Sequence, residues 1–257
     1  MILTNNEFLL LGIILSLGIS LLGVFIVLRK MVLVGDVLSH VALPGFALAV
    51  LYNIHPFWGA LLFLLIAVFG IIFLERYYSI SLETTVGIFF TAFLAIGLVL
   101  IPNTELAESL FGDISELGIF DFYLTIILGL FVLFSVLIFF NKFAKISISR
   151  TLAEAEGIGF WRIELIFLML LALVVALGVK SIGVLLIGAL IILPASAAKN
   201  VSNSLKAMTF FSIIFGVISM LGGFYLALYF NLPLGPVIIL VGVIIFMLSL
   251  IAKLVRS

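Results

Sequence analysis

Apolar residues run through this chain in long blocks, separated by short clusters of charged residues, Pro and Asn. A helix needs about 20 apolar residues to cross the hydrocarbon core of a bilayer. Because the blocks do not alternate with a period of two, we expect helices and not the strands of a closed barrel. Nine spans are predicted, at roughly 8–28, 32–52, 57–74, 84–101, 121–140, 163–179, 182–198, 207–230 and 234–252.

The segment 182–198 is the weakest of these nine. Gly178 precedes it, two further glycines lie within it, and Pro194 stands close to its end. Such a segment is predicted to be a ninth span or a broken, re-entrant element, in which case eight spans cross completely.

Basic residues predict the orientation of the spans. With the N-terminus outside and the C-terminus cytoplasmic, nine spans place eleven of the twelve Lys and Arg residues inside and only Lys180 outside. Cytoplasmic loops of membrane proteins carry this excess of basic residues. The eleven are Arg29, Lys30, Arg76, Lys142, Lys145, Arg150, Arg162, Lys199, Lys206, Lys253 and Arg256.

Composition agrees with a membrane protein. Hydrophobic residues make up 66% of the 257 residues and charged residues only 9%, whereas a soluble domain carries about 25% charged residues. One all-α transmembrane domain is therefore expected over 1–257. The net charge of zero gives no preference for nucleic acid, and the lack of cysteine excludes disulfides and thiolate metal ligands.

Two features are predicted at the outer side. His55, next to Pro56 and Trp58, is interpreted as an interfacial anchor more readily than as a ligand. An acidic loop at about 102–121 contains no basic residue, which suits either ordinary solvation or a docking surface for cations or a basic partner. Its acidic residues are Glu105, Glu108, Asp113, Glu116 and Asp121.

Asp36 and His40 are the most informative polar residues, because both fall inside the second predicted span. At 1.5 Å per residue, His40 lies about 15 Å from Lys30, close to the bilayer midplane. Residues at i and i+4 share one helix face. Ionisable residues in such positions usually face the bundle interior or a water-filled path, and carboxylate and imidazole groups suit Zn²⁺ or Mn²⁺. Hydrogen bonding within the core is the alternative role. Two ligands from one helix do not complete a site, so a second copy in a homodimer would have to supply the rest.

Pro44 and Gly45 follow one turn later and are expected to interrupt this helix, as in the broken helices that line transport sites. Glu83 opens the fourth span from the inside. A favourable interaction of its charge with the helix dipole is preferred there over a role in transport.

The longest inner loop, about 142–162, is predicted to hold a short amphipathic helix. Ser149 or Thr151 is expected to cap its start, and Gly157 to end it. The helix would contain the residues Leu152, Ala153, Glu154, Ala155 and Glu156.

No phosphate loop, H-E-x-x-H or G-x-S-x-G motif occurs in the sequence. An enzyme is therefore not expected, and any use of ATP would require another subunit. An intramembrane hydrolase built on Asp36 and His40 lacks a nucleophile and a second carboxylate.

The sequence resembles the ABC-3 family, the permeases of zinc, manganese and iron ABC importers, over almost its whole length. The motifs that carry the resemblance are Gly35-Asp-Val-Leu-Ser-His-Val-Ala-Leu-Pro-Gly45, Glu83-Thr-Thr-Val-Gly-Ile88, Leu110-Phe-Gly-Asp-Ile114, Ala153-Glu-Ala-Glu-Gly157, Ser181-Ile-Gly-Val-Leu-Leu-Ile-Gly-Ala-Leu-Ile-Ile-Leu-Pro-Ala195 and Asn231-Leu-Pro-Leu-Gly-Pro236.

The resemblance implies a fold similar to type II ABC importer permeases, and a homodimer in the cytoplasmic membrane of a prokaryote. Two cytoplasmic ATPase subunits and an extracytoplasmic metal-binding protein would be its partners. In that family the D-x-x-x-H pair, here Asp36 and His40, is associated with metal coordination in the pathway. The segment from Leu152 to Gly157 takes the position of the helix that seats in the ATPase.

Two alternatives remain at this point: a permease for metal chelates such as siderophores, haem or cobalamin, and a stand-alone secondary carrier or channel. Asp36 and His40 argue against the first, and co-purification of an ATPase would reject the second. No permanently bound cofactor is expected. Zinc is the preferred transported ion, with manganese or iron next, because the ligand set does not demand the octahedral oxygen shell that manganese prefers.

Overall fold

The computed structural model describes residues 4–100 and 117–256, and helices are the regular elements of this part of the chain. Long apolar segments become helices because only a helix satisfies its own backbone groups in lipid. The helices are α1 (Asn5–Leu28), α2 (Val32–Leu51), α3 (Pro56–Tyr78), α4 (Leu82–Leu100), α6 (Ile119–Ile148), α7 (Arg150–Ala155), α8 (Phe160–Ile182), α9 (Val184–Val201), α10 (Leu205–Phe230) and α11 (Leu234–Arg256).

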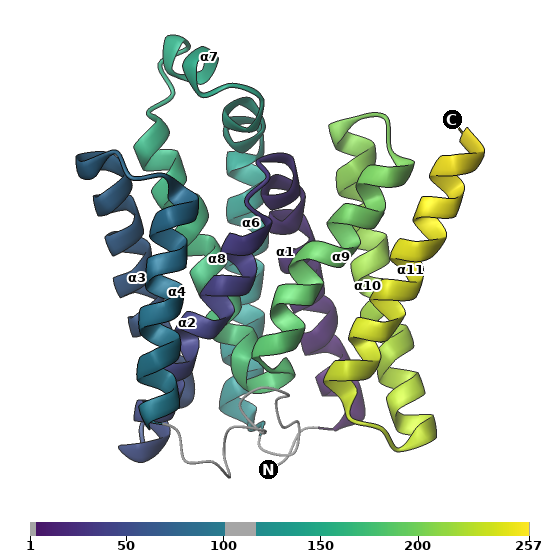
Figure 1. Cartoon of the computed structure of the whole chain (residues 1–257). Helices are drawn as coiled ribbons and strands as arrows, with labels where there is room; N and C mark the ends of the chain where they lie inside the picture. The colour runs from purple at the N-terminus through teal and green to yellow at the C-terminus, as the bar shows by residue number, and fades with distance from the viewer. Residues whose placement is uncertain (1–3, 101–116, 257) are drawn as a thin grey trace.

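Eight of the described helices are long and apolar enough to cross a membrane. Within α9, the segment Leu186–Val201 is a shorter apolar helix. Including its first turn, α9 has 18 residues, about 27 Å of helix. The N-terminus lies at one end of the bundle, whereas α7 and the C-terminus lie at the other (Figure 1). Termini at opposite ends require an odd number of crossings, and the described helices give an odd number when α9 is counted beside the eight candidate spans.

The helix bounds agree with the predicted spans to within a few residues, except at α6. This helix continues to Ile148, where the sequence predicted a span ending near 140 and a loop from about 142. Lys142 and Lys145 made the segment resemble a loop, but the helix extends past the apolar block. The non-helical part of the predicted loop is correspondingly shorter.

Several helices end at a residue in the left-handed conformation. Lys30, Asn53, Ser79 and Asn231 have φ values of 59°, 54°, 55° and 51°, and each lies at or just after the end of a helix. This conformation reverses the chain direction at a helix end, which keeps consecutive helices antiparallel.

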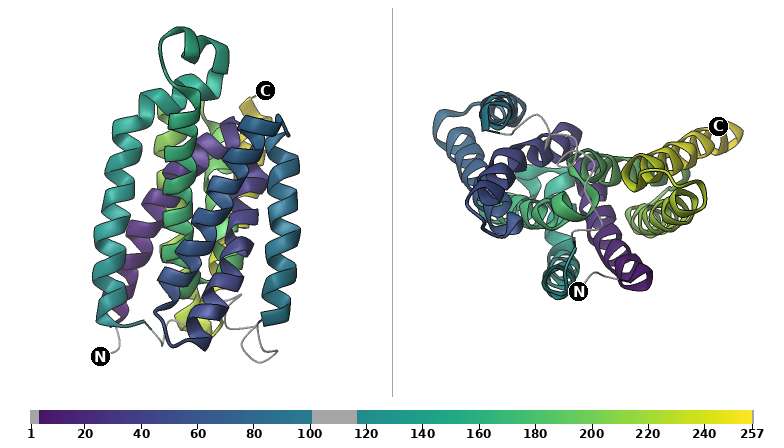
Figure 2. Two further views of the ribbon diagram at one scale, coloured as in Figure 1. Left: turned by 90° about the vertical axis from the view of Figure 1, so that its left-hand side faces the viewer. Right: turned by 90° about the horizontal axis from the view of Figure 1, so that it is seen from below.

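The core of the bundle is formed by α1, α2 and α8, which are the most buried of the predicted spans. Contacts join α2 to α3, α4, α8 and α9, and α9 in turn packs on α1, α10 and α11. Seen along the helices, α3 and α4 lie at one end of an elongated cross-section and α10 and α11 at the other (Figure 2).

The predicted interruption at Pro44 and Gly45 is wrong, because α2 is one continuous helix from Val32 to Leu51. Neighbouring helices can support a Pro within a membrane helix, and both residues are buried. Gly45 instead provides a close crossing with α3. A side chain at Gly45 would collide with the carbonyl oxygen of Gly59, and one at Gly59 would collide with that of Gly45.

Candidate functional site

Asp36 and His40 lie one turn apart on α2, in the interior part of the bundle, and both are half-buried. The hydroxyl of Ser39, which is fully buried between them, donates to the carbonyl of Gly35 at 3.0 Å. Ser39 therefore satisfies its own hydrogen-bonding need within the helix.

Gly188 of α9 packs directly on Asp36. A methyl group at this glycine would lie 2.6 Å from the carboxylate oxygen Oδ1 of Asp36. Only a glycine leaves this space open to the carboxylate. The glycines of this segment weakened its prediction as a span, and the contact with Asp36 was not predicted. Its signal was the position of Gly188 within the long Ser181–Ala195 motif.

His40 contacts the ring of Phe90 on α4, with 5.5 Å between the ring centroids and an edge-on geometry. Its Nδ1 atom is buried and has no hydrogen-bond partner among the described residues. A buried imidazole nitrogen without a partner is uncommon in folded proteins. Among the described residues nothing occupies this nitrogen, which leaves it for a ligand from outside them.

A cavity of about 670 Å³ lies beside α2, between the α1–α2 turn and the start of α4. Asp36 and Glu83 both line it, so two carboxylates face one space. Lys30 also lines the cavity. Ser81 caps α4 by accepting from the backbone N–H of Thr84 at 3.3 Å, and Glu83, in the first turn of this helix, lines the cavity.

Within residues 4–100 and 117–256, no group of three or more His, Asp or Glu side chains comes close enough to hold a metal ion. Asp36 and His40 thus offer at most two ligands from one copy of the chain. Zn²⁺ usually takes four ligands, so further donors would have to come from elsewhere.

His55 lies at the end of the molecule that carries the N-terminus and has a more specific role than the predicted anchor. Its Nδ1 accepts from the backbone N–H of Phe57 at 3.4 Å, which caps α3. Its Nε2 is 3.0 Å from Oδ1 of Asp121. Because Asp121 also accepts from the backbone N–H of Gly118 in the first turn of α6, it belongs to a helix and not to the predicted acidic loop.

The remaining acidic residues of that predicted loop, Glu105, Glu108, Asp113 and Glu116, lie outside the described residues.

At the opposite end, α7 projects beyond the other helices (Figure 1). Ser149 is its cap, because its hydroxyl accepts from the backbone N–H of Leu152 at 3.4 Å. Gly157 follows with a φ of 79°, the left-handed conformation typical of helix ends. Ala153 is buried, whereas Leu152 is 63% exposed, so an apolar side chain of α7 points away from the bundle.

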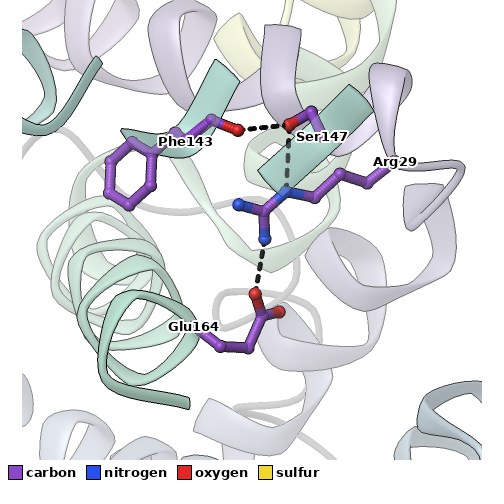
Figure 3. A network of polar contacts seen from close by, with 4 residues as sticks. All are labelled: Arg29, Phe143, Ser147 and Glu164. Atoms are coloured by element: carbon purple, nitrogen blue, oxygen red, sulfur yellow. Dashed lines mark hydrogen bonds and ion pairs between the residues drawn. The ribbon is translucent and has the colours of Figure 1, made fainter. Parts of the chain in front are cut away.

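Arg29, Ser147 and Glu164 form a buried polar network that the sequence analysis missed (Figure 3). Nη1 of Arg29 donates to Oε2 of Glu164 at 2.6 Å, and Nε donates to the hydroxyl of Ser147 at 3.1 Å. The guanidinium also lies 4.6 Å from the ring centre of Phe167. Arg29 was predicted only as one of the basic residues that set the orientation.

Residues 3–253 match the family model described as the ABC 3 transport family. The chain belongs to this family. Among its relatives, the high-affinity zinc uptake system membrane protein ZnuB of Buchnera aphidicola is 33% identical over 249 residues, which are 95% of each chain. The manganese transport system membrane protein MntC of Listeria innocua is 35% identical over 234 residues, or 90% of this chain and 84% of the relative.

A solved structure, PsaBC from Streptococcus pneumoniae in complex with Fab, has the same fold. The TM-score is 0.84 with 33% sequence identity, over 95% of this chain and 90% of that one. The likeness spans nearly all of both chains, and it confirms the family resemblance carried by the sequence motifs.

Proposed function

We propose that the chain is the membrane-spanning permease subunit of an ATP-driven importer of divalent transition-metal ions. The observation that carries the proposal is the Asp36–His40 pair inside the bundle of a chain that is similar along its length to zinc and manganese permeases. Ionisable residues within membrane helices are costly and mark transport paths. The protein would act in the cytoplasmic membrane of a prokaryote.

The energy source would be a separate ATPase subunit. The sequence contains no phosphate loop, so this chain has no means of its own to bind and hydrolyse ATP. The projecting helix α7, with Leu152 exposed, supports docking of the ATPase at this end. That end would then be cytoplasmic, in agreement with the orientation predicted from the basic residues.

A homodimer would complete the metal site. One copy offers Asp36 and His40, and a partner copy related by a two-fold axis would offer the same pair. Four oxygen and nitrogen donors match the coordination number of Zn²⁺. A metal-binding protein outside the membrane would deliver the ion.

Transport would follow alternating access. The ion would enter from the N-terminal end and bind between Asp36 and His40. It would then leave through the cavity shared by Asp36 and Glu83, which lies toward the α7 end. No covalent chemistry is required of the chain: its side chains exchange the ion's ligands, and ATP hydrolysis by the partner changes which end is open.

Zinc is the proposed ion, and manganese is the main alternative. The relatives include both zinc and manganese proteins, and affinity alone does not separate such ions. The imidazole of His40 favours zinc over an all-oxygen manganese site.

The role of the pair is tested by replacing Asp36 and His40 separately with Ala. Each variant should abolish metal uptake by cells or proteoliposomes, because a site that loses a ligand no longer holds the ion. Each variant should still co-purify with the ATPase. Gly222→Ala on α10 is a suitable control, since the added methyl group would meet nothing closer than 3.4 Å. Uptake at the wild-type rate in both Asp36→Ala and His40→Ala would reject the proposed site.

A further inference from the structure

Arg29 connects three helices at the end of the bundle that carries α7. It directly follows α1 as the cap of that helix's C-terminal end, and its side chain is only 6% exposed. Its guanidinium reaches Glu164 on α8 and Ser147 on α6 at the same time (Figure 3). A buried ionised side chain in a membrane protein is costly, and such residues commonly mark functional sites.

Arg29 contacts α6 and α8, and these two helices also contact α7. Ser147 precedes the α7 cap, Ser149, by two residues. The side chains of Lys145 and Glu156 form an ion pair across the α6–α7 junction. On the other side, the guanidinium of Arg150 lies 4.0 Å from the ring centre of Phe160, at the start of α8. A displacement of α7 therefore acts directly on the partners of Arg29.

Arg29 also leads directly into the helix that carries the metal site. The turn to α2 is short and closed by hydrogen bonds, from Met31 N–H to the carbonyl of Ile26 at 2.9 Å and from Val34 N–H to that of Met31 at 3.0 Å. Asp36 follows Arg29 by seven residues. A tight turn of this kind does not absorb a displacement as a long loop would.

The network is not fully satisfied in this conformation. Nη2 of Arg29 and Oε2 of Glu75 are both buried and make no hydrogen bond to the described residues. Glu75 is close enough to Glu164 and Arg150 to interact electrostatically with both. Because Arg29 keeps an unused donor, its side chain is suited to exchange partners between two conformations.

We propose that Arg29 is a positioning residue that relays movement of α7 to α2, through Ser147 and Glu164. The inference rests on the proposed function, because it is the docked ATPase that would move α7. It adds the mechanical link between the ATPase and Asp36, which the motifs of the sequence do not reveal.

Two variants separate this relay from simple stability. Arg29→Lys keeps the positive charge opposite Glu164 but loses the planar fork that reaches two acceptors at once. Ser147→Ala removes the link from Arg29 to α6, together with the hydrogen bond within α6 from the Ser147 hydroxyl to the carbonyl of Phe143. Ser135→Ala is the matched control, since Ser135 lies on the same helix and lines a different, apolar cavity.

The natural absence of cysteine allows movement of α2 to be measured with one introduced thiol. Leu33 lies in the first turn of α2, is 69% exposed, and borders the same cavity as Asp36. Leu33→Cys is placed in the chain, and the complex with its ATPase is reconstituted. The rate of maleimide labelling is then compared without nucleotide and with ATP plus vanadate. ATP hydrolysis and thermal stability are measured on the same samples.

We expect ATP and vanadate to change the labelling rate in the Leu33→Cys chain and equally in its Ser135→Ala variant. Ser147→Ala and Arg29→Lys should lose most of this change while still hydrolysing ATP and keeping their thermal stability. If ATP and vanadate changed the labelling rate in both variants as much as in the Leu33→Cys chain, the relay would be overturned and the proposed function would stay intact. If the Leu33→Cys chain and the unmodified chain both failed to bind an ATPase, the proposed function would fail, and the relay with it.

Discussion

At the scale of single residues, the proposed site depends on small neighbours as much as on its proposed ligands. Asp36 faces a glycine of α9, and the ring of His40 packs nearly perpendicular to that of Phe90. Binding geometry must be held to within about 0.5 Å for a site to function well. The space left by Gly188 therefore fixes where the carboxylate of Asp36 can lie.

Gly188→Ala should weaken metal transport without removing a ligand. Its methyl group would lie 2.6 Å from Oδ1 of Asp36, so the carboxylate must rotate away. We expect the concentration of metal for half-maximal uptake to rise about tenfold, which corresponds to about 1.4 kcal/mol. Gly222→Ala adds the same methyl group where the nearest atom is 3.4 Å away. It should leave the concentration for half-maximal uptake unaltered. An unchanged uptake curve for Gly188→Ala would show that this contact does not position the carboxylate.

Asp36 and His40 were predictable from the sequence because charged groups stand out within an apolar block. Their surroundings were not predictable, since Gly188 and Phe90 come from distant helices and local spacing carries no record of such contacts. Arg29 and Glu164 were missed for a related reason. Each lies at the end of a span, where a charged residue is expected to be solvated, and only the fold shows that they are buried together.

At the scale of helices, hydropathy predicted the membrane spans well. It did not predict how far a helix extends beyond its apolar block. The apolar blocks report the thickness of the membrane, but α6 extends beyond its block to Ile148. The sequence likewise predicted a break at Pro44, because a proline removes one backbone hydrogen bond. It could not show that packing on α3 keeps α2 intact.

The short helix α7 should depend on its cap. With six residues, it is far below the length at which a helix is stable in water. Ser149→Ala removes the hydroxyl that accepts from Leu152 N–H, a loss of about 1 kcal/mol. If docking requires an ordered α7, ATPase binding should weaken about fivefold, as measured by titrating labelled ATPase onto the purified permease.

Thr151→Ala tests the alternative cap considered from the sequence. Thr151 does not accept the capping hydrogen bond in this structure, so its variant should bind the ATPase nearly as well as wild type. Equal losses for Ser149→Ala and Thr151→Ala would contradict the assignment of Ser149.

At the scale of the whole molecule, the two ends of the bundle have different tasks. The end with the N-terminus carries the His55–Asp121 pair, which ties α3 to α6. The other end carries α7, the Arg29 network and the mouth of the cavity that reaches Asp36. In the proposed importer, ATP is used at this second end and its effect must reach the middle of the membrane.

The most direct test of this account is ATP-driven metal uptake by the purified chain in proteoliposomes. The chain would be reconstituted with and without its ATPase, and Zn²⁺ and Mn²⁺ would be supplied separately with the delivering protein. We predict uptake only when both ATPase and ATP are present, with Zn²⁺ carried in preference to Mn²⁺. Uptake by the chain alone, driven by an ion gradient, would contradict the account and identify a secondary carrier.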